Sequence, residues 1–340
     1  MKSAVYTIPG KFKIILAADP KIQNPTDVLL RVHSVGVCGS DLHYFRVNRI
    51  GEQVIDGPFI MGHECTAVVE TVGSEVTRLK PGDRVAVEPA VSCGSCEQCL
   101  DKRPHTCLHL TFLGAPGQLD GALREFIVMP EDNCYLIPEN LDLSTAIWVE
   151  PLSIGLYASR MVRSLYPLDT GVLGAGPIGL SVLQAIQISG WEPVLVTDKL
   201  DYRLQIAKLF YAQNTCSPNI ESDLEPFYHS LDIVFECCGQ QDAFDQAVRL
   251  LKPGGHLVVV GIPELEVWTI DPHQLRRKEI TIHNVRRQNG CIKPAIDMLV
   301  ASVEKFKPLI THVFPLEEIE KAFELTESYQ DGVMKTIIQL

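Results

Sequence analysis

Four cysteines lie within one short, mostly polar segment of the chain. Cys93, Cys96, Cys99 and Cys107 have the spacing Cys-x₂-Cys-x₂-Cys-x₇-Cys, which lets one looped segment place four thiolates tetrahedrally around Zn²⁺. Four protein ligands leave no open position, so we predict a structural ion. The alternatives are four buried thiols or a redox pair. The odd total of eleven cysteines favours metal thiolates in a reducing compartment over disulfides.

A glycine-rich segment has the pattern of a dinucleotide-binding turn. Gly174-Ala-Gly-Pro-Ile-Gly179 follows a short apolar run and precedes an apolar helical pattern. Glycines at these positions let the backbone approach a pyrophosphate, which the helix N-terminus stabilises. The alternative is a plain turn between strand and helix. The residues that we predict to contact the cofactor are Gly174, Gly176, Pro177, Ile178, Gly179, Asp198, Arg203, Val260, Gly261 and Ile262.

Asp198 indicates which cofactor this turn would bind. It ends the next predicted strand about twenty residues on, where a carboxylate accepts hydrogen bonds from the ribose hydroxyls and repels a 2′-phosphate. We therefore predict NAD. Lys199 and Arg203 are cations at the same place, and they leave NADP open.

A second set of metal-ligand types is dispersed along the chain. Cys38 lies in Gly36-Val-Cys-Gly-Ser-Asp41, His63 and Glu64 are adjacent, and Glu150 precedes Pro151. Spacing alone does not make these residues a site, because a lone cysteine in a β-rich segment is more often core and a lone glutamate is usually solvated.

Length and charge limit the possible functions. A chain of 340 residues exceeds the size of one hydrophobic core, which favours two domains. The formal net charge of −12 argues against nucleic acid or an anionic membrane as a partner. The first residues lack the apolar core of a signal peptide, and no stretch is apolar for long enough to span a bilayer. We therefore expect a cytoplasmic protein.

The predicted elements change character along the chain. Residues 4–87 contain short β-rich runs such as 27–36 and 65–73, separated by Gly and Pro turns, which predicts an antiparallel barrel. From about residue 170, strand candidates at 171–173, 193–197, 231–235 and 256–260 alternate with helical patterns, as in βαβ units. The proline-broken stretch 216–226 predicts a lost or trimmed helix. The tail from residue 294 predicts two helices and a final strand at 335–339 that returns to the first domain.

Together these motifs resemble the medium-chain zinc-dependent dehydrogenases. Gly-Val-Cys-Gly-Ser-Asp-Leu-His-Tyr, Gly-His-Glu, the cysteine segment, Glu-Pro-Leu and Gly-Ala-Gly-Pro-Ile-Gly stand in that family's order, and the sequence looks most like the sorbitol (L-iditol) and xylitol dehydrogenase branch. The resemblance implies an α/β plus β fold, in which a GroES-like β-barrel catalytic domain (1–150 and 290–340) contains an inserted Rossmann domain with a doubly wound parallel sheet (151–289).

The resemblance also implies roles for individual residues. Cys38, His63 and Glu64 would hold a catalytic zinc, with Glu150 at or beside the ion where alcohol dehydrogenases have a cysteine. Ser40 would take the proton of the alcohol and His43 would pass it toward solvent. Taken without the family, Ser40 would be a helix cap and His43 a surface histidine.

Substrate contacts are expected from Tyr44, Glu150 and Arg286. Tyr44 and Phe45 both follow the segment that contains Cys38, the predicted zinc ligand. The resemblance implies that Arg286 holds a substrate hydroxyl. Many relatives have an aromatic residue where this chain has Arg287. Because neighbouring residues of a strand point to opposite faces, only one of the two arginines should enter the cleft. Two arginines there would favour a substrate with a carboxylate or phosphate.

The function implied is the oxidation of a secondary alcohol of a polyol to a ketose with NAD⁺, by a homodimer or homotetramer with one catalytic and one structural zinc per chain. One alternative is a zinc dehydrogenase for another alcohol, such as L-threonine, a sugar acid or a sugar-phosphate polyol. Another is a catalytically silent member that still binds NAD.

Overall fold

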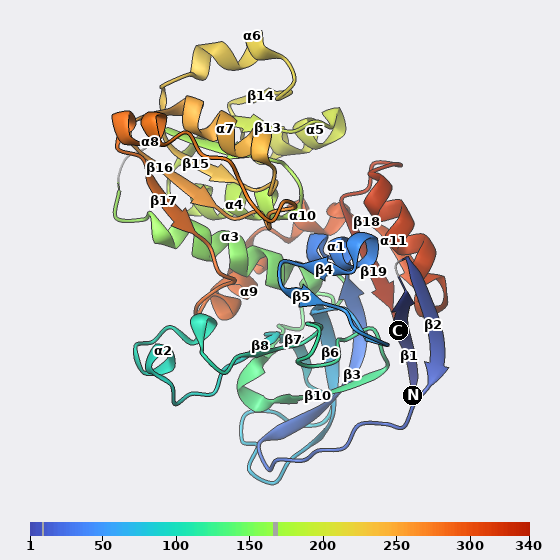
Figure 1. Cartoon of the computed structure of the whole chain (residues 1–340). Helices are drawn as coiled ribbons and strands as arrows, with labels where there is room; N and C mark the ends of the chain where they lie inside the picture. The colour runs from blue at the N-terminus through green and yellow to red at the C-terminus, as the bar shows by residue number, and fades with distance from the viewer. Residues whose placement is uncertain (9, 166–168) are drawn as a thin grey trace. The chain divides into compact units, whose positions relative to one another are not determined.

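A computed structural model describes residues 1–8, 10–165 and 169–340 of the chain. It divides into two compact units: one contains residues 1–150 and 292–340, and the other contains residues 151–291. The boundary near residue 290 therefore lies two residues later than the predicted one. Figure 1 shows both units. Among the described residues, no helix combines the length and the apolar character that crossing a membrane requires.

The first unit is built mainly of strands. Its elements are β1 (Lys2–Ile8), β2 (Lys11–Leu16), β3 (Asp27–Gly36), α1 (Gly39–Val47), β4 (Arg49–Ile50), β5 (Gln53–Val54), β6 (Glu64–Val72), β7 (Arg84–Val87), β8 (Ala90–Val91), α2 (Glu97–Leu100), β9 (Thr111–Phe112), β10 (Phe126–Pro130), β11 (Cys134–Leu136), α9 (Ile292–Ala301), α10 (Val303–Phe306), β18 (Ile310–Pro315), α11 (Ile319–Ser328) and β19 (Lys335–Gln339).

The main sheet of this unit has the strand order β11-β7-β6-β3-β19-β18, and β10 also pairs with β3. The final strand returns to this unit as predicted, because β19 pairs antiparallel with β3. The tail contains one strand that sequence reasoning missed, β18, and it pairs parallel with β19. The sheet is therefore mixed, whereas the prediction was a purely antiparallel barrel.

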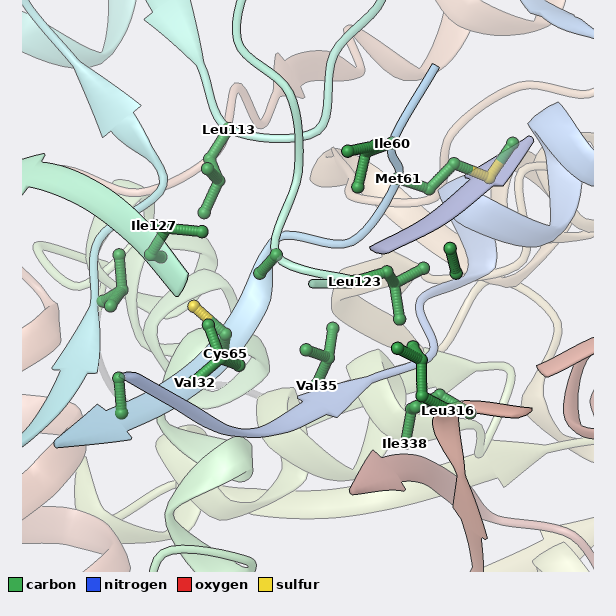
Figure 2. Packing of buried hydrophobic residues seen from close by; sticks show 14 of the residues in the cluster. Val32, Val35, Ile60, Met61, Cys65, Leu113, Leu123, Ile127, Leu316 and Ile338 are labelled. Atoms are coloured by element: carbon green, nitrogen blue, oxygen red, sulfur yellow. The ribbon is translucent and has the colours of Figure 1, made fainter. Parts of the chain in front are cut away.

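Alternation along the strands supplies the core of the first unit. In β3, Val28, Leu30 and Val32 face inward and are buried, as the period of two in a strand requires. Figure 2 shows Val32, Val35 and Cys65 packed together with Leu123, Ile127 and Ile338. This core joins segments from both ends of the chain. Its close packing holds β3 and β6 in fixed positions.

The second unit has alternating strands and helices. Its elements are α3, which begins at the end of the first unit (Val149–Met161), β12 (Asp169–Leu173), α4 (Pro177–Ile188), β13 (Glu192–Thr197), α5 (Asp201–Leu209), β14 (Asn214–Cys216), α6 (Glu221–Leu224), β15 (Leu231–Glu236), α7 (Gln241–Leu250), β16 (Leu251–Val259), α8 (Pro272–Lys278) and β17 (Thr281–Asn284).

These six strands form one parallel sheet in the order β14-β13-β12-β15-β16-β17, with helices packed against it (Figure 1). The four predicted strands are confirmed as β12, β13, β15 and β16, and their continuous apolar runs reflect burial on both faces. The trimmed helix is also confirmed, since α6 spans only Glu221–Leu224. The order reverses between β12 and β15, where doubly wound sheets bind their ligands.

Candidate zinc and dinucleotide sites

The pairing of β3 with β6 brings the dispersed ligand types together. Gly36 at the end of β3 lies opposite Glu64 at the start of β6, and Cys38 follows two residues after Gly36. As a result the ligand atoms of Cys38, His63 and Glu64 all lie within 4.8 Å of one another. Three converging ligands of these types suit a Zn²⁺ ion with one position left open.

Close backbone packing holds the segment that carries His63. Gly62 has φ +93°, a conformation that side chains other than hydrogen disfavour. A Cβ on Gly114 would lie 2.8 Å from the Gly62 carbonyl oxygen, and one on Gly121 would collide with the Met61 carbonyl. These glycines let the backbones near residues 62, 114 and 121 approach one another closely beside His63 in the sequence.

Asp41 orients the imidazole of His63. Its Oδ1 lies 3.5 Å from His63 Nδ1, and both residues are buried. A carboxylate on Nδ1 leaves Nε2 to face a metal, the usual arrangement around zinc. Burial by itself lowers the pKa of His63, but the negative charges of Asp41 and Cys38 raise it well above 6.5. Sequence reasoning missed Asp41, although it lies inside the Gly-Val-Cys-Gly-Ser-Asp motif.

Lys335 is a second residue that the sequence did not reveal. Its ammonium group, 1% exposed, forms an ion pair with Glu64 Oε2 and donates to the carbonyl of Val37 at 3.3 Å. The Nζ atom also lies 5.9 Å from the centre of the Trp148 ring. A Cβ on Gly36 would collide with the Glu64 carboxylate and approach the Lys335 side chain, so a larger residue there would displace the ion pair. The only local signal was a lysine in an apolar strand.

Helix α1 carries the predicted proton relay. Cys38 is the N-cap residue of α1, so the cap interpretation of Ser40 is wrong. Ser40 and His43 are both half-buried and three residues apart, which places them on neighbouring positions of one helix face.

The predicted substrate contacts of the first unit differ from the relay in their surroundings. Tyr44 and Phe45 both belong to the hydrophobic core of the unit. Tyr44 is 5% exposed, and its hydroxyl donates to Gln53 Oε1 at 3.2 Å. Glu150 lies in the first turn of α3 and is half-buried. It is not among the three residues whose ligand atoms converge, so its place at the metal stays a prediction.

The four-cysteine segment has the geometry of a metal site. The Sγ–Sγ distances are 3.4 Å for Cys93–Cys107, 3.5 Å for Cys96–Cys99, 3.8 Å for Cys96–Cys107 and 4.0 Å for Cys93–Cys99. Tetrahedral Zn–S bonds of about 2.3 Å imply sulfurs about 3.8 Å apart. The donors present therefore fit zinc, and no disulfide occupies them, since all the described cysteines are free.

Backbone N–H groups donate hydrogen bonds to the sulfur atoms of the four-cysteine segment, and such bonds stabilise the thiolate form that binds a metal cation. The N–H of Cys96 donates to Cys93 Sγ at 3.4 Å and that of His109 to Cys107 Sγ at 3.4 Å. Hydrogen bonds from Ser95 and Cys96 lower the pKa of Cys93 to about 5, whereas burial raises that of Cys99 to about 12. The thiolate of Cys93, a metal-binding form, is thus favoured near neutral pH.

The glycine-rich turn adopts the predicted strand–turn–helix form. Gly174 has φ +95°, Gly176 is the N-cap and Pro177 begins α4. A Cβ on Gly179 would collide with the Gly174 carbonyl. Ile178 is half-buried in the first turn of the helix. The tight turn before α4 carries no side chain at its glycines. A pyrophosphate can therefore approach the backbone N–H groups at the N-terminus of the helix.

Asp198 ties this turn to the loop after β13. Its Oδ2 accepts from the N–H of Ala175 at 2.8 Å and its Oδ1 from that of Leu200 at 2.9 Å. Arg203 Nη1 lies 3.9 Å from Asp198, and Lys199 is paired with Asp242 at 3.0 Å. Lys199 and Arg203, the two cations that could accept the 2′-phosphate of NADP, are therefore each beside a carboxylate.

The other predicted residues of the second unit lie in loops. Val260, Gly261 and Ile262 follow β16, and Ile262 is 47% exposed. Arg286 is exposed, and Arg287 is half-buried with φ +56°. Strand β17 ends at Asn284, so the expectation that strand alternation separates the two arginines is wrong: both lie in the loop after the strand.

Two family models match the chain. Residues 24–139 match the alcohol dehydrogenase GroES-like domain and residues 177–301 match the zinc-binding dehydrogenase model. The sorbitol dehydrogenase of Bacillus subtilis (strain 168) is 34% identical over 99% of this chain and 97% of its own length. The L-idonate 5-dehydrogenase of Vitis vinifera is 33% identical over 93% of this chain and 88% of its own.

A solved structure shares the whole architecture. A short chain alcohol dehydrogenase from E. coli CFT073, complexed with the cofactor NADH, superimposes with a TM-score of 0.89 and 29% identity, covering 100% of this chain and 99% of that chain. The similarity thus includes both units.

Proposed function

Because the chain belongs to the medium-chain zinc-dependent dehydrogenases, we propose that it oxidises a secondary alcohol of a polyol to the ketose, with NAD⁺ as the hydride acceptor. One observation carries the proposal: Cys38, His63 and Glu64 converge within 4.8 Å in a chain that aligns over almost its full length with a sorbitol dehydrogenase. The same convergence argues against a catalytically silent member, which need not retain these ligands.

The residues of the first unit have distinct roles in this proposal. Cys38, His63 and Glu64 would hold the catalytic zinc, and the four cysteines 93, 96, 99 and 107 the structural one. When bound, Zn²⁺ polarises the substrate hydroxyl as a Lewis acid and NAD⁺ accepts the hydride. Asp41 keeps His63 in one orientation, and Lys335 balances the charge of Glu64.

Proton removal is assigned to α1. Ser40 accepts the hydroxyl proton of the substrate as it releases its own hydroxyl proton to His43 on the same helix face, and His43 passes a proton on toward solvent. Glu150 and Tyr44 remain candidates for contacts with the polyol. In the second unit, the turn 174–179 would bind the pyrophosphate of NAD, and Asp198 would accept hydrogen bonds from the ribose and repel a 2′-phosphate.

Assembly and compartment are part of the proposal. We expect a homodimer or homotetramer on the strength of the family resemblance. We expect a reducing compartment such as the cytoplasm because the described cysteines are all free and four of them form a thiolate-rich metal site.

An NAD⁺-reduction screen tests the proposal. Sorbitol, xylitol, galactitol, L-threonine and aldonates are assayed with NAD⁺ and with NADP⁺, before and after chelation. We expect activity on at least one neutral polyol with NAD⁺ that is lost with chelator and in C38S, and retained in C216S, a matched change of a buried cysteine outside both sites. Failure of every polyol to reduce NAD⁺ would refute the proposal.

The same screen, with a polyol phosphate added to the substrates, decides a second candidate, a sugar acid or sugar-phosphate substrate. It is favoured by the adjacent Arg286 and Arg287 in the loop after β17 and by similarity to an L-idonate 5-dehydrogenase. A preference for the acid or phosphate over the neutral polyol that disappears in R286A would establish it. Equal rates on both would remove its support.

A further inference from the structure

The parallel sheet contains a buried carboxyl group that none of the roles above uses. Glu236 is the last residue of β15 and is fully buried, with 0% exposure. Its Oε1 accepts from the N–H groups of Cys238 at 2.6 Å and Gly239 at 2.7 Å. Its Oε2 has no hydrogen-bond partner among the described residues. Burying a carboxyl group costs desolvation free energy, so we expect Glu236 to have a role that offsets this cost.

The backbone of the same residue holds a second loop. The carbonyl of Glu236 accepts from the N–H of Val260 at 2.8 Å and of Gly261 at 3.0 Å. Glu236 therefore binds both the loop after β15, through its side chain, and the loop after β16, through its carbonyl. The two loops touch directly, because a Cβ on Gly261 would collide with the backbone of Gly239.

The loop after β15 also reaches the glycine-rich turn. The N–H of Cys237 donates to the carbonyl of Leu173 at 2.9 Å, and Cys238 Sγ lies 3.2 Å from the same oxygen. A Cβ on Gly174 would lie 2.7 Å from Cys238 Sγ. The position of Cys238 thus limits where the turn can lie.

These contacts surround the crevice between β12 and β15, where the strand order reverses and a dinucleotide would bind. We propose that Glu236 is a positioning residue of the dinucleotide site, whose Oε1 holds the loop 237–239 against the glycine-rich turn and thereby shapes the surface that receives the cofactor. The inference rests on the proposed use of NAD. It requires the acceptor Oε1, and it does not require Oε2 or a negative charge.

Three variants separate these requirements. E236Q keeps an acceptor oxygen at the same reach, E236A removes it, and E236D shortens the side chain. T170V is the matched control, because Thr170 is equally buried and its hydroxyl donates to the Glu192 carbonyl at 2.9 Å at the opposite, amino end of β12. NADH affinity is measured by fluorescence titration without substrate, and hydrogen exchange of 237–240 is measured in cofactor-free protein.

We expect E236A and E236D to weaken NADH binding about tenfold or more, as the loss of two hydrogen bonds implies, and to speed exchange at 237–240. E236Q should stay within about threefold of wild type, and T170V should bind NADH normally. In turnover, KM for NAD⁺ should rise in E236A while kcat at saturating NAD⁺ and KM for the polyol change little.

Two results would overturn the inference: NADH binding by E236A and E236D equal to wild type, or equal weakening in T170V, which would make the effect one of general stability. Should E236A not fold, E236D and E236Q still decide between these outcomes. Absence of NADH binding in the wild-type protein would instead refute the proposed function, so the two failures are distinguishable.

Discussion

The ion pair between Lys335 and Glu64 is costly to build, because both charges are removed from water. Such burial costs several kcal/mol per ion unless partners replace the solvent. Lys335 has three partners: the Glu64 carboxylate, the Val37 carbonyl and the face of Trp148. Each partner lies in the first unit near the predicted zinc ligands. Lys335 therefore compensates the charge of Glu64, a predicted zinc ligand, from a position where the sequence alone indicated only a strand.

In protein freed of metal by chelation, we expect K335M to lower the free energy of unfolding by roughly 3–5 kcal/mol, because the change leaves Glu64 charged and buried without a counter-ion. K335R, which keeps the charge, should lose less. K252M is the control, since Lys252 forms an ion pair at 37% exposure and such pairs contribute about 1 kcal/mol or less. Urea unfolding monitored by circular dichroism measures all three. Equal losses in K335M and K252M would contradict the assigned importance of the buried pair.

Glu236 gives the stability a dependence on pH. Burial raises its pKa to about 7, although hydrogen bonds from Cys238 and Gly239 act to lower it. A carboxyl group whose pKa is raised by folding stabilises the fold fully below its unfolded pKa, here 4.5. That contribution is lost as the pH rises through the folded value.

We therefore expect the unfolding free energy of wild type, relative to E236Q, to fall by about 3 kcal/mol between pH 4.5 and pH 7.5. Gln cannot ionise, so the difference between the two proteins isolates this one group. Urea titrations at several pH values measure it. A difference that is constant with pH would show that Glu236 has the same pKa in the folded and unfolded chain.

Helix α2 and its flanking loops form an element without a hydrophobic core. The helix spans only Glu97–Leu100, none of its residues is buried, and Leu100 is 71% exposed. So short a helix is unstable on its own. The free energy that orders the four-cysteine segment must come largely from metal–thiolate bonds, as in small zinc-dependent domains.

We expect C96S to lose one of the two zinc ions per chain and to unfold the segment 93–107 locally, while the ions and fold elsewhere persist. C134A is the control, since Cys134 is equally a free thiol of the first unit but lies in its hydrophobic core. Metal analysis combined with hydrogen exchange reports both effects. Full zinc content in C96S with unchanged exchange would exclude the four-cysteine site.

The loop at Arg286 and Arg287 shows where element-level prediction failed. The sequence predicts an extended strand through both arginines, but β17 ends at Asn284 and Arg287 adopts φ +56°. A left-handed arginine has no signature in a single sequence, because tertiary contacts impose it against its intrinsic preference. The short strand β18 was missed for a related reason: strands depend on partners distant in sequence.

At the scale of the whole molecule, each unit has its own core and its own ligand. The first unit contains both candidate zinc sites, and the second contains the dinucleotide turn. A ligand that binds only the folded form stabilises that form by mass action, by about 2.7 kcal/mol at a hundredfold excess over Kd.

We expect saturating NADH to slow hydrogen exchange chiefly in residues 169–291, and chelation to speed it chiefly in residues 38–64 and 93–107. The chelator should act in two phases, because a three-residue site with an open position releases its ion more readily than four thiolates. Mass spectrometry of exchanged peptides distinguishes the two responses. Uniform protection by NADH across both units would contradict the assignment of the cofactor to the second.

The sequence by itself determined that a strand-rich region precedes a βαβ region, and it located the four-cysteine segment and the glycine-rich turn, because each has a signature in local spacing or periodicity. It did not determine the parallel pairing of β18 with β19, which makes the sheet of the first unit mixed. It could propose Cys38, His63 and Glu64 as one site only through family resemblance. Tertiary structure alone decided that Lys335, 271 positions from Glu64, forms an ion pair with this predicted zinc ligand, that Asp41 lies beside His63, and that Glu236 holds two loops through hydrogen bonds. These contacts form when distant strands pair, and a buried charge has no meaning until the fold has removed the water around it.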